Sequence, residues 1–263
     1  MTDAAPEEVR FESADGVATI TIDRPARRNA LNDTVIERLR QGLARARADE
    51  AVRVVMLTGA GDRVFSAGGD LSPGAGGGGI LGLHHRRGGF AELLLELREL
   101  GKPTIARVNG DALGGGVGLA LACDLTVARE DARFGCPELD VGLFPMMISA
   151  ILTRSVPRKV AVELMLTGRR LDAREAKALG VINDAMAPEA LDTRVAELAQ
   201  GLAAKSPAVM RLGLEALRHT EDMSLEESLR HLQLALSMNT LAEDAAEGVM
   251  AFLQKRPPVW KGR

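Results

Sequence analysis

The stretch 104–122, TIARVNGDALGGGVGLALA, places three consecutive glycines between a strand-like run and an apolar helix-like run. With no side chains at 114–116, the unpaired N–H groups and the positive dipole end of a helix N-terminus can approach a ligand oxygen closely. A second glycine pair, Gly68-Gly69, follows another strand-like run at 54–58. Two separate peptide N–H donors aimed at one carbonyl oxygen would form an oxyanion hole.

The first half of the chain alternates strand-like and helix-like segments. We expect strands at 17–22, 52–57, 104–108 and 125–128, and helices at about 33–46 and 90–100. This alternation favours right-handed βαβ crossovers in a mainly parallel α/β sheet. After about Pro157 the strand signal fades and helix starts follow. These starts are the capping boxes Asp172/Glu175, Ser224/Glu227 and Thr240/Glu243 and the pair Ser206-Pro207.

Composition narrows the class of protein. A length of 263 residues fits one large domain, or a core with a smaller appendage. Aromatic residues are only 3% of the chain, so the core must be aliphatic. The net charge of -3 argues against a nucleic-acid binder, and local Arg pairs such as Arg45/Arg47 are interpreted as solvated helix faces.

The cysteines and the N-terminus bear on the compartment. Cys123 and Cys136 follow neither metal-binding nor CxxC spacing, which is compatible with a reducing cytosol. Residues 1–10 are polar and acidic, unlike a secretory signal, and no apolar run approaches the roughly 18–20 residues of a membrane span. We therefore expect a soluble, cytoplasmic protein without a membrane partner.

Two glycine-rich segments allow more than one interpretation. The run 114–118 could be a dinucleotide-binding turn, but it lacks the third glycine and lies in the middle of the chain. The segment 72–79 directly follows the first glycine pair. It is either a disordered surface insertion or a mobile lid over a pocket.

Taken together, the segments resemble the crotonase superfamily, the enoyl-CoA hydratase/isomerase family. The match runs in family order from about residue 10 to the C-terminus. Its segments are Arg24-Pro25, RNALN at 28–32, FSAGGD at 65–70, VNGDALGGG at 108–116, ACD at 122–124, FGCPE at 134–138, VGLFP at 141–145, LTG at 166–168, LGVIN at 179–183 and FLQKR at 252–256.

The resemblance implies a fold and a substrate. The fold is a crotonase-like spiral of repeated ββα units over 1–200, followed by a helical trimerisation region over 201–263. The expected assembly is a homotrimer or a dimer of trimers. The substrate would be an acyl-CoA thioester, with coenzyme A as part of the substrate and with no permanently bound cofactor and no metal.

The resemblance also implies roles for individual residues. The N–H groups of Gly69 and Gly115 would form the oxyanion hole, and Glu138 would transfer protons. Phe252 and Lys255, predicted to lie one helical turn apart on the same face, would reach a neighbouring subunit's coenzyme A. The other interpretation of Lys255 is a solvated lysine near a helix end. Further residues assigned to substrate binding are Arg28 and Ala30, near the adenine, and Ala67, Asp70, Gly118 and Met146.

The chain departs from the family pattern at one catalytic position. Typical hydratases use two glutamates, of which Glu138 is present, while the other position is Gly118. Glu138 could instead be a carboxylate that caps a local N–H. One carboxylate can remove and return a proton, so the pattern favours double-bond isomerisation somewhat over hydration. Acids that the family's dienoyl isomerases carry at position 118 and near Met146 are also missing.

Several residues could replace the missing acid. Asp111 precedes the glycine run, and its alternative role is that of a turn residue that binds local backbone N–H groups. His84, His85 and Glu92 could reach the acyl pocket. The sequence thus predicts an acyl-CoA enzyme that isomerises or hydrates an enoyl-CoA. The alternatives are a crotonase-type decarboxylase of a carboxyacyl thioester and a catalytically weak acyl-CoA-binding protein.

Overall fold

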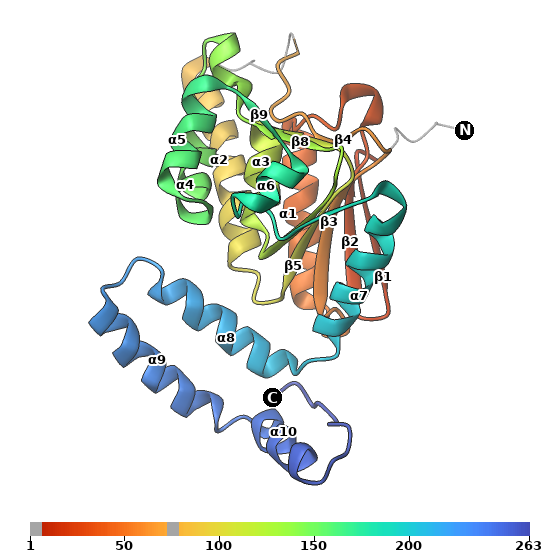
Figure 1. Ribbon diagram of the computed structural model, residues 1–263, viewed down its shortest axis with the longest axis vertical. Coiled ribbons are helices and arrows are strands. Elements are labelled where there is room, and N and C mark those ends of the chain that lie inside the picture. Colours follow the sequence, from red (N-terminus) through yellow and green to blue (C-terminus); the bar gives the residue numbers. More distant parts are fainter. Residues whose placement is uncertain (1–6, 73–78) are drawn as a thin grey trace.

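The computed structural model describes residues 7–72 and 79–263, without the side chains at positions 80, 83, 85 and 86. Two β-sheets form its centre (Figure 1). The larger sheet has the strand order β1-β2-β3-β5-β7-β10, and only β1 is antiparallel to its neighbour. Its strands are β1 (Val9–Ala14), β2 (Val17–Ile22), β3 (Val54–Gly59), β5 (Thr104–Val108), β7 (Leu125–Arg129) and β10 (Asp184–Met186).

The smaller sheet consists of three-residue strands in the order β4-β6-β8-β9. Each strand β3, β5 and β7 of the larger sheet is followed by one short strand of the smaller sheet and then by a helix or helical turn. This repetition is the predicted spiral of ββα units. The short strands are β4 (Val64–Ser66), β6 (Asp111–Leu113), β8 (Arg133–Gly135) and β9 (Arg170–Asp172).

Helices cover both faces of the larger sheet. Helix α7 packs on one face through Leu191, Val195 and Ala199, while α1, α2 and α3 lie on the other face (Figure 1). The helices are α1 (Asp33–Ala48), α2 (Gly79–Arg98), α3 (Gly115–Ala122), α4 (Met146–Ser155), α5 (Arg158–Thr167), α6 (Ala173–Ala178), α7 (Leu191–Ala203), α8 (Pro207–Thr220), α9 (Leu225–Asn239) and α10 (Glu243–Leu253).

Most predicted helix starts are correct. Asn32 Oδ1 accepts a hydrogen bond of 2.7 Å from the Val35 N–H at the start of α1. Side chains also cap α6 and α8, and α9 has a full capping box. The predicted start at Thr240 is wrong, because Thr240 directly follows the last residue of α9, and Ala242 precedes α10 without a side-chain cap. The strands β9 and β10 correct the expectation that strands end near Pro157.

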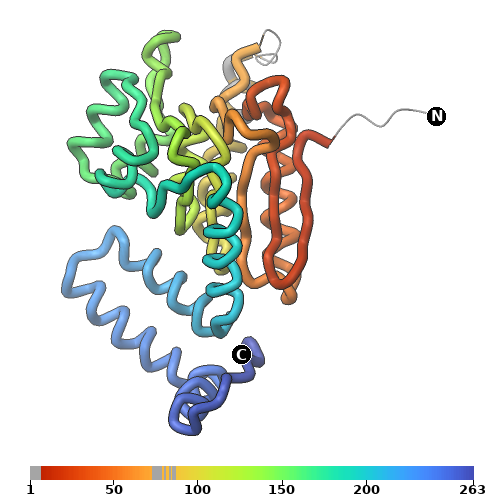
Figure 2. The backbone as a smooth tube through the Cα atoms, turned by 45° about the vertical axis from the view of Figure 1, so that its right-hand side comes forward, coloured from red at the N-terminus to blue at the C-terminus, as the bar shows by residue number. Residues whose placement is uncertain are grey.

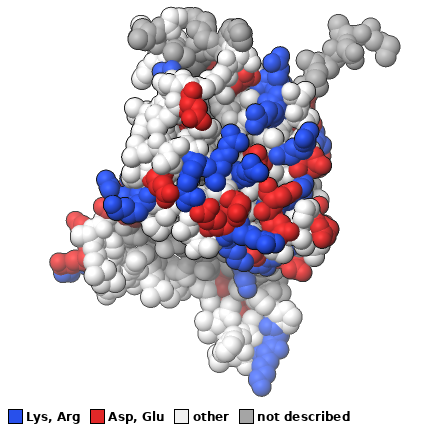
Figure 3. Space-filling view, turned by 45° about the horizontal axis from the view of Figure 1, so that its top comes forward, with Lys and Arg blue, Asp and Glu red and all other residues white. Residues whose placement is uncertain are grey.

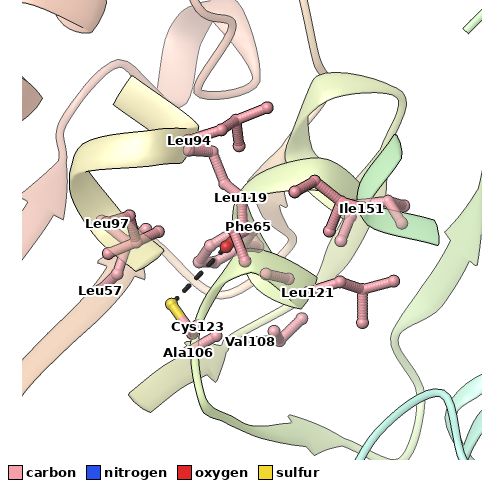
Figure 4. Packing of buried hydrophobic residues seen from close by; sticks show 14 of the residues in the cluster. Leu57, Phe65, Leu94, Leu97, Ala106, Val108, Leu119, Leu121, Cys123 and Ile151 are labelled. Atoms are coloured by element: carbon pink, nitrogen blue, oxygen red, sulfur yellow. Dashed lines mark hydrogen bonds between the residues drawn. The ribbon is translucent and has the colours of Figure 1, made fainter. Parts of the chain in front are cut away.

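The core is aliphatic, as the composition predicts. Both cysteines are buried and free, and Cys123 Sγ lies 3.5 Å from the Leu119 carbonyl oxygen (Figure 4). Burial raises the pKa of the Cys123 thiol and raises that of Cys136 to about 12. The side chains labelled in Figure 4 come from β3, β4, β5, α2, α3 and α4, together with Cys123 at the end of α3: Leu57, Phe65, Leu94, Leu97, Ala106, Val108, Leu119, Leu121, Cys123 and Ile151.

Helices α8 to α10 lie apart from the two sheets (Figures 1 and 2). Ion pairs attach α8 to the core. They join Arg218 to Asp124 at 3.0 Å and Arg98 to Glu221. Many large apolar side chains of the three helices are exposed, including Leu225 at 77% and Phe252 at 83%. The boundary at residue 200 and the trimerisation role stay predictions.

The charged side chains on the face in Figure 3 are mixed. Lys and Arg alternate there with Asp and Glu, unlike the single-sign basic area of a nucleic-acid-binding surface. Within the described residues, no helix has both the length and the apolar character that crossing a bilayer requires.

Candidate active site

The glycine run places a helix N-terminus at the edge of the smaller sheet. Gly114 adopts φ 52° and ψ −123°, a conformation that side chains disfavour, and its N–H donates a 2.9 Å bond to the Gly135 carbonyl. Helix α3 then begins at Gly115. The Gly115 N–H bonds to no acceptor among the described residues, as expected for the first turn of a helix. This N–H and the helix dipole are therefore available to an anionic oxygen.

A second N–H donor comes from the Gly68-Gly69 loop. The Leu31 N–H donates to the Gly68 carbonyl at 2.8 Å, and the Asp70 N–H donates to the Leu31 carbonyl at 3.0 Å. Because these bonds flank Gly69, its own N–H is directed away from Leu31, and it meets no acceptor within the part of the chain that the structure describes.

The two loops touch at their glycines. Gly68 has φ +87°, and a Cβ atom there would lie 2.9 Å from the Gly115 nitrogen and 2.8 Å from the Leu113 carbonyl oxygen. Only a residue without a side chain allows this approach. The fold thus brings together the two predicted donors, Gly69 and Gly115, although their bonding to a substrate stays a prediction.

Glu138 lies directly beside this pair of loops. It belongs to a 3₁₀ helix at Pro137–Val141, and its Oε1 is 2.9 Å from the position that a Cβ on Gly114 would take. Its Oε2 is buried and has no hydrogen-bond partner among the described residues. Burial raises the pKa of Glu138. A carboxylate of this kind suits proton transfer closer to neutral pH than an ordinary glutamate.

An isoleucine occupies the place next to Gly118. A Cβ on Gly118 would lie 2.4 Å from Ile148 Cγ2, and Ile148 is only 3% exposed. Phe90 Cζ and Leu31 Cδ1 lie 3.4 and 3.3 Å from the position of a Cβ on Gly115. Ile148, Phe90 and Leu31 therefore form an apolar wall beside the two N–H donors. No motif marks Ile148 or Phe90 in the sequence, where they look like ordinary core residues, whereas Leu31 belongs to the RNALN segment at 28–32.

The predicted residues Arg28, Ala30, Ala67 and Asp70 adjoin the first donor loop. The Ala67 N–H bonds to the Arg28 carbonyl at 3.0 Å. Arg28 itself is exposed, and both Ala30 and Ala67 are half-buried.

The Asp70 carboxylate faces other protein groups. Ser72 donates to it from its hydroxyl at 2.6 Å and from its N–H at 3.0 Å, and Arg24 donates at 3.0 Å. The hydrogen bonds from Ser72, followed by those from Arg24, lower the pKa of Asp70. Arg24 also bonds to the Ala30 carbonyl at 2.7 Å, so it links the segment around Ala30 to the donor loop.

Three other predicted substrate contacts lie at the periphery. Met146 begins α4 and is 71% exposed. Phe252 is 83% exposed on α10, which lies far from α3 in Figures 1 and 2. The prediction that Phe252 and Lys255 share a helix face is wrong. Helix α10 ends at Leu253, and Lys255 lies beyond it with a left-handed φ of 53°. Within one chain, Phe252 and Lys255 do not join the site.

Two candidates for a replacement acid, Asp111 and Glu92, have contacts with groups other than Glu138. Asp111 Oδ1 accepts the Arg133 N–H at 3.0 Å, in agreement with its interpretation as a backbone-binding residue. Glu92 is exposed on α2. The pKa of Arg40 on α1 is raised chiefly by its hydrogen bond to Glu96, and the negative charge of Glu92 adds to this effect. His84 is also exposed on α2, whereas the side chain of His85 and residues 73–78 of the predicted lid lie outside the described part.

A separate cavity of about 380 Å³ opens at the opposite end of α3, against α8. Its charged side chains pair with one another through the Arg218–Asp124 and Arg98–Glu221 bonds. Among its described lining residues, both carboxylates, Asp124 and Glu221, therefore have partners, in contrast to Glu138. In the described ranges, no group of three or more His, Cys, Asp or Glu residues is placed to hold a metal ion.

Comparison with known proteins identifies the family and the fold of the chain. The enoyl-CoA hydratase/isomerase family model matches residues 12–263. The chain belongs to the enoyl-CoA hydratase/isomerase family, and its named relatives are enzymes.

Two relatives and one solved structure illustrate the similarity. Carnitinyl-CoA dehydratase of Citrobacter koseri is 37% identical over 98% of this chain and 99% of its own length. The 2,3-dehydroadipyl-CoA hydratase of Escherichia coli is 36% identical over 94% of this chain and 96% of its own. The crystal structure of an enoyl-CoA hydratase from Bacillus anthracis superimposes with a TM-score of 0.92 at 32% identity, covering 97% of this chain and 100% of that one. The crotonase-like fold is therefore confirmed.

Proposed function

We propose that this enzyme stabilises a thioester enolate in an oxyanion hole and moves one proton with Glu138. The Gly69 and Gly115 N–H groups would hold the enolate oxygen, where preorganised donors are worth several kcal/mol. The observation that carries the proposal is the buried, unpartnered Oε2 of Glu138, whose carboxyl group lies beside Gly114, the residue directly before α3. A substrate proton is a natural partner for such an oxygen.

The reaction that needs only these groups is a double-bond shift in a 3-enoyl-CoA. The Glu138 carboxylate removes a proton from C2, and the electron pair of that bond delocalises onto the thioester oxygen to give a dienolate. Glu138, now protonated, returns the proton to C4. The C2–C3 double bond forms as the thioester carbonyl is restored, so no water or co-reactant is consumed.

Ile148 favours this isomerisation over hydration. Hydration requires a water molecule to be held and split, for which two carboxylates are the better arrangement. In this chain Gly118 stands where the second carboxylate would be. Ile148 Cγ2 lies 2.4 Å from the position that a Cβ on Gly118 would take. A substrate would therefore meet a methyl group instead of an acid.

Hydration of a 2-enoyl-CoA is the second candidate function. It is favoured by relatives named as a hydratase and a dehydratase at 36% and 37% identity. A single acid/base group would then have to position the water.

Product analysis on a panel of thioesters tests the choice. We expect a 3-enoyl-CoA to be converted to its 2-enoyl isomer, with slow hydration of the 2-enoyl-CoA and no loss of carbon dioxide from a carboxyacyl-CoA. Fast hydration would establish the hydratase, and decarboxylation would establish the crotonase-type decarboxylase instead. Acyl-CoA binding without turnover of any panel member would make the protein a binding protein.

We also propose a trimer or a dimer of trimers. The exposed apolar side chains of α8 to α10 need cover, and a second copy would supply it. Phe252 and Lys255 would then lie near the coenzyme A of a neighbouring subunit, whose adenine would approach Arg28 and Ala30. Light scattering tests this assembly, since a stable monomer that turns over acyl-CoA would contradict it.

A further inference from the structure

Ser66 is a fully buried polar residue at the end of β4, directly before the first donor loop. Its hydroxyl donates a 2.9 Å hydrogen bond to the Asn29 carbonyl and accepts a 3.2 Å bond from the Gly68 N–H. Both partners of the hydroxyl are therefore backbone groups next to the proposed oxyanion hole.

Ser66 also contacts the second half of the site. A Cβ on Gly116 would lie 2.4 Å from the Ser66 carbonyl oxygen and 2.9 Å from Ser66 Cβ. Ser66 additionally pairs with Ala112 on β6, the strand that leads into the glycine run. One residue thus touches the loop that carries Gly69 and the helix that begins at Gly115.

Peptide geometry connects this contact to the direction of the donor. The Gly68 carbonyl and the Gly69 N–H belong to one planar peptide and point in opposite directions. Leu31 holds the carbonyl side of that peptide, and Ser66 holds the N–H of the peptide before it. Because Gly68, at φ +87°, has no side chain to restrict it, these two bonds set the angle at which the Gly69 N–H meets a ligand.

We propose that Ser66 is a positioning residue that aligns the Gly69 N–H with the Gly115 N–H. The inference rests on the proposed function, since it assumes that these two groups hold the thioester oxygen. Ser66 does not touch the substrate. Its effect passes through the Gly68 peptide, and loss of the hydroxyl leaves the Gly68 N–H buried without an acceptor and free to tilt.

The variant Ser66→Ala tests the proposal. Loss of a whole oxyanion donor costs about 10²–10³ in kcat, so tilting one donor should lower kcat of the double-bond shift by roughly tenfold. The KM should stay within about twofold, because Ser66 is fully buried and does not itself touch the substrate. Thr126→Val is the matched control, since it removes a buried hydroxyl bonded to the Ala120 carbonyl at the other end of α3.

A spectroscopic measurement separates alignment from general destabilisation. Infrared difference spectra of a bound, unreactive saturated acyl-CoA labelled with ¹³C at the carbonyl report how strongly the donors polarise that bond. We expect a lowered carbonyl frequency in the unmodified protein and in Thr126→Val, and a partial return toward the free value in Ser66→Ala. Ser66→Cys, a close-sized variant whose sulfur is a weak acceptor, should give an intermediate frequency.

The outcomes distinguish this inference from the proposed function. A lowered frequency in the unmodified protein with the same frequency in Ser66→Ala and Ser66→Cys would overturn the role of Ser66 and leave the oxyanion hole intact. No lowering in the unmodified protein would overturn both. If Ser66→Ala does not fold, the frequency and the kcat of Ser66→Cys decide in the same way.

Discussion

One methyl group at position 118 should destabilise this protein, and shortening Ile148 should reverse much of that effect. A Cβ on Gly118 would lie 2.4 Å from Ile148 Cγ2, about 1 Å inside the 3.4 Å at which ordinary contact begins. Both residues are buried, so neither side can move into solvent. The variants Gly118→Ala and Ile148→Ala, alone and combined, form a double-mutant cycle that measures this contact.

The structure gives the magnitudes. Overpacking of this kind costs about 1–3 kcal/mol, and replacing a glycine inside a helix returns about 0.5–1 kcal/mol, so Gly118→Ala should lose up to about 2.5 kcal/mol. Ile148→Ala should lose about 2–5 kcal/mol through its cavity. In the double variant the new methyl group enters the vacated space. The combined loss should therefore be smaller than the sum of the single losses by about 1–3 kcal/mol.

Urea unfolding at fixed protein concentration measures the cycle. Gly201→Ala on α7 is the control, because a Cβ there meets nothing within 4 Å and should stabilise the helix. Additivity of the two single variants within about 0.5 kcal/mol would refute the reasoning. The same cycle extends to function. Gly118→Glu alone should hydrate a 2-enoyl-CoA poorly, and adding Ile148→Ala should increase that rate.

Three further predictions concern Lys255, Asp244 and Glu138. Lys255→Gly should raise the free energy of unfolding by about 1 kcal/mol, because glycine adopts the left-handed end of α10 without strain, and should weaken coenzyme A binding in titration calorimetry. Unchanged affinity would remove Lys255 from the proposed site. Burial tends to raise the pKa of Asp244, but hydrogen bonds from the Ser206 hydroxyl and from the N–H groups of Lys261 and Gly262 outweigh burial, so the pKa is lowered overall. The stability it contributes is therefore present above its unfolded pKa of about 3.9 and is lost as the pH falls through the lower folded value. Asp244→Asn should cost about 2–4 kcal/mol at pH 7 in urea unfolding and flatten that acid dependence, whereas an equal loss at every pH would contradict the account. The pKa of Glu138 is raised, so its ionisation costs stability as the pH rises through the unfolded and then the folded pKa. Glu138→Gln should therefore raise the melting temperature at pH 7 but not below about pH 4, and a lower melting temperature at pH 7 would refute this.

The longer elements of the fold could be predicted from the sequence. Strand β2 and helix α1 show clear hydrophobic periods of two and 3.6 residues over at least six positions. The hydrophobic pattern does not predict the individual strands of the smaller sheet, because a three-residue strand is too short to display an alternation. Thr240 matched the capping pattern but directly follows the last residue of α9, since a four-residue pattern does not fix which turn becomes helical.

The sequence predicts those parts of the candidate site that consist of backbone N–H groups. The glycines that carry the two N–H donors form visible runs, and Glu138 follows a proline in a recognisable segment. Ile148 carries no such signal, and Ser66 lies within the FSAGGD segment without any role predicted for it, because the importance of both comes from contacts with residues distant in the chain. The sequence shows that Gly118 departs from the family pattern, but it does not show that Ile148 fills the space beside Gly118.

Exchange of the C2 proton of a bound saturated acyl-CoA with deuterium from solvent tests the central claim most directly. This exchange needs only the oxyanion hole and one base, and mass spectrometry detects it whatever the acyl chain. The unmodified protein should exchange the proton, and Glu138→Gln should slow the exchange by about 10²–10⁴ while acyl-CoA affinity changes only a few-fold. Exchange by Glu138→Gln at the unmodified rate, or none by the unmodified protein, would contradict the account.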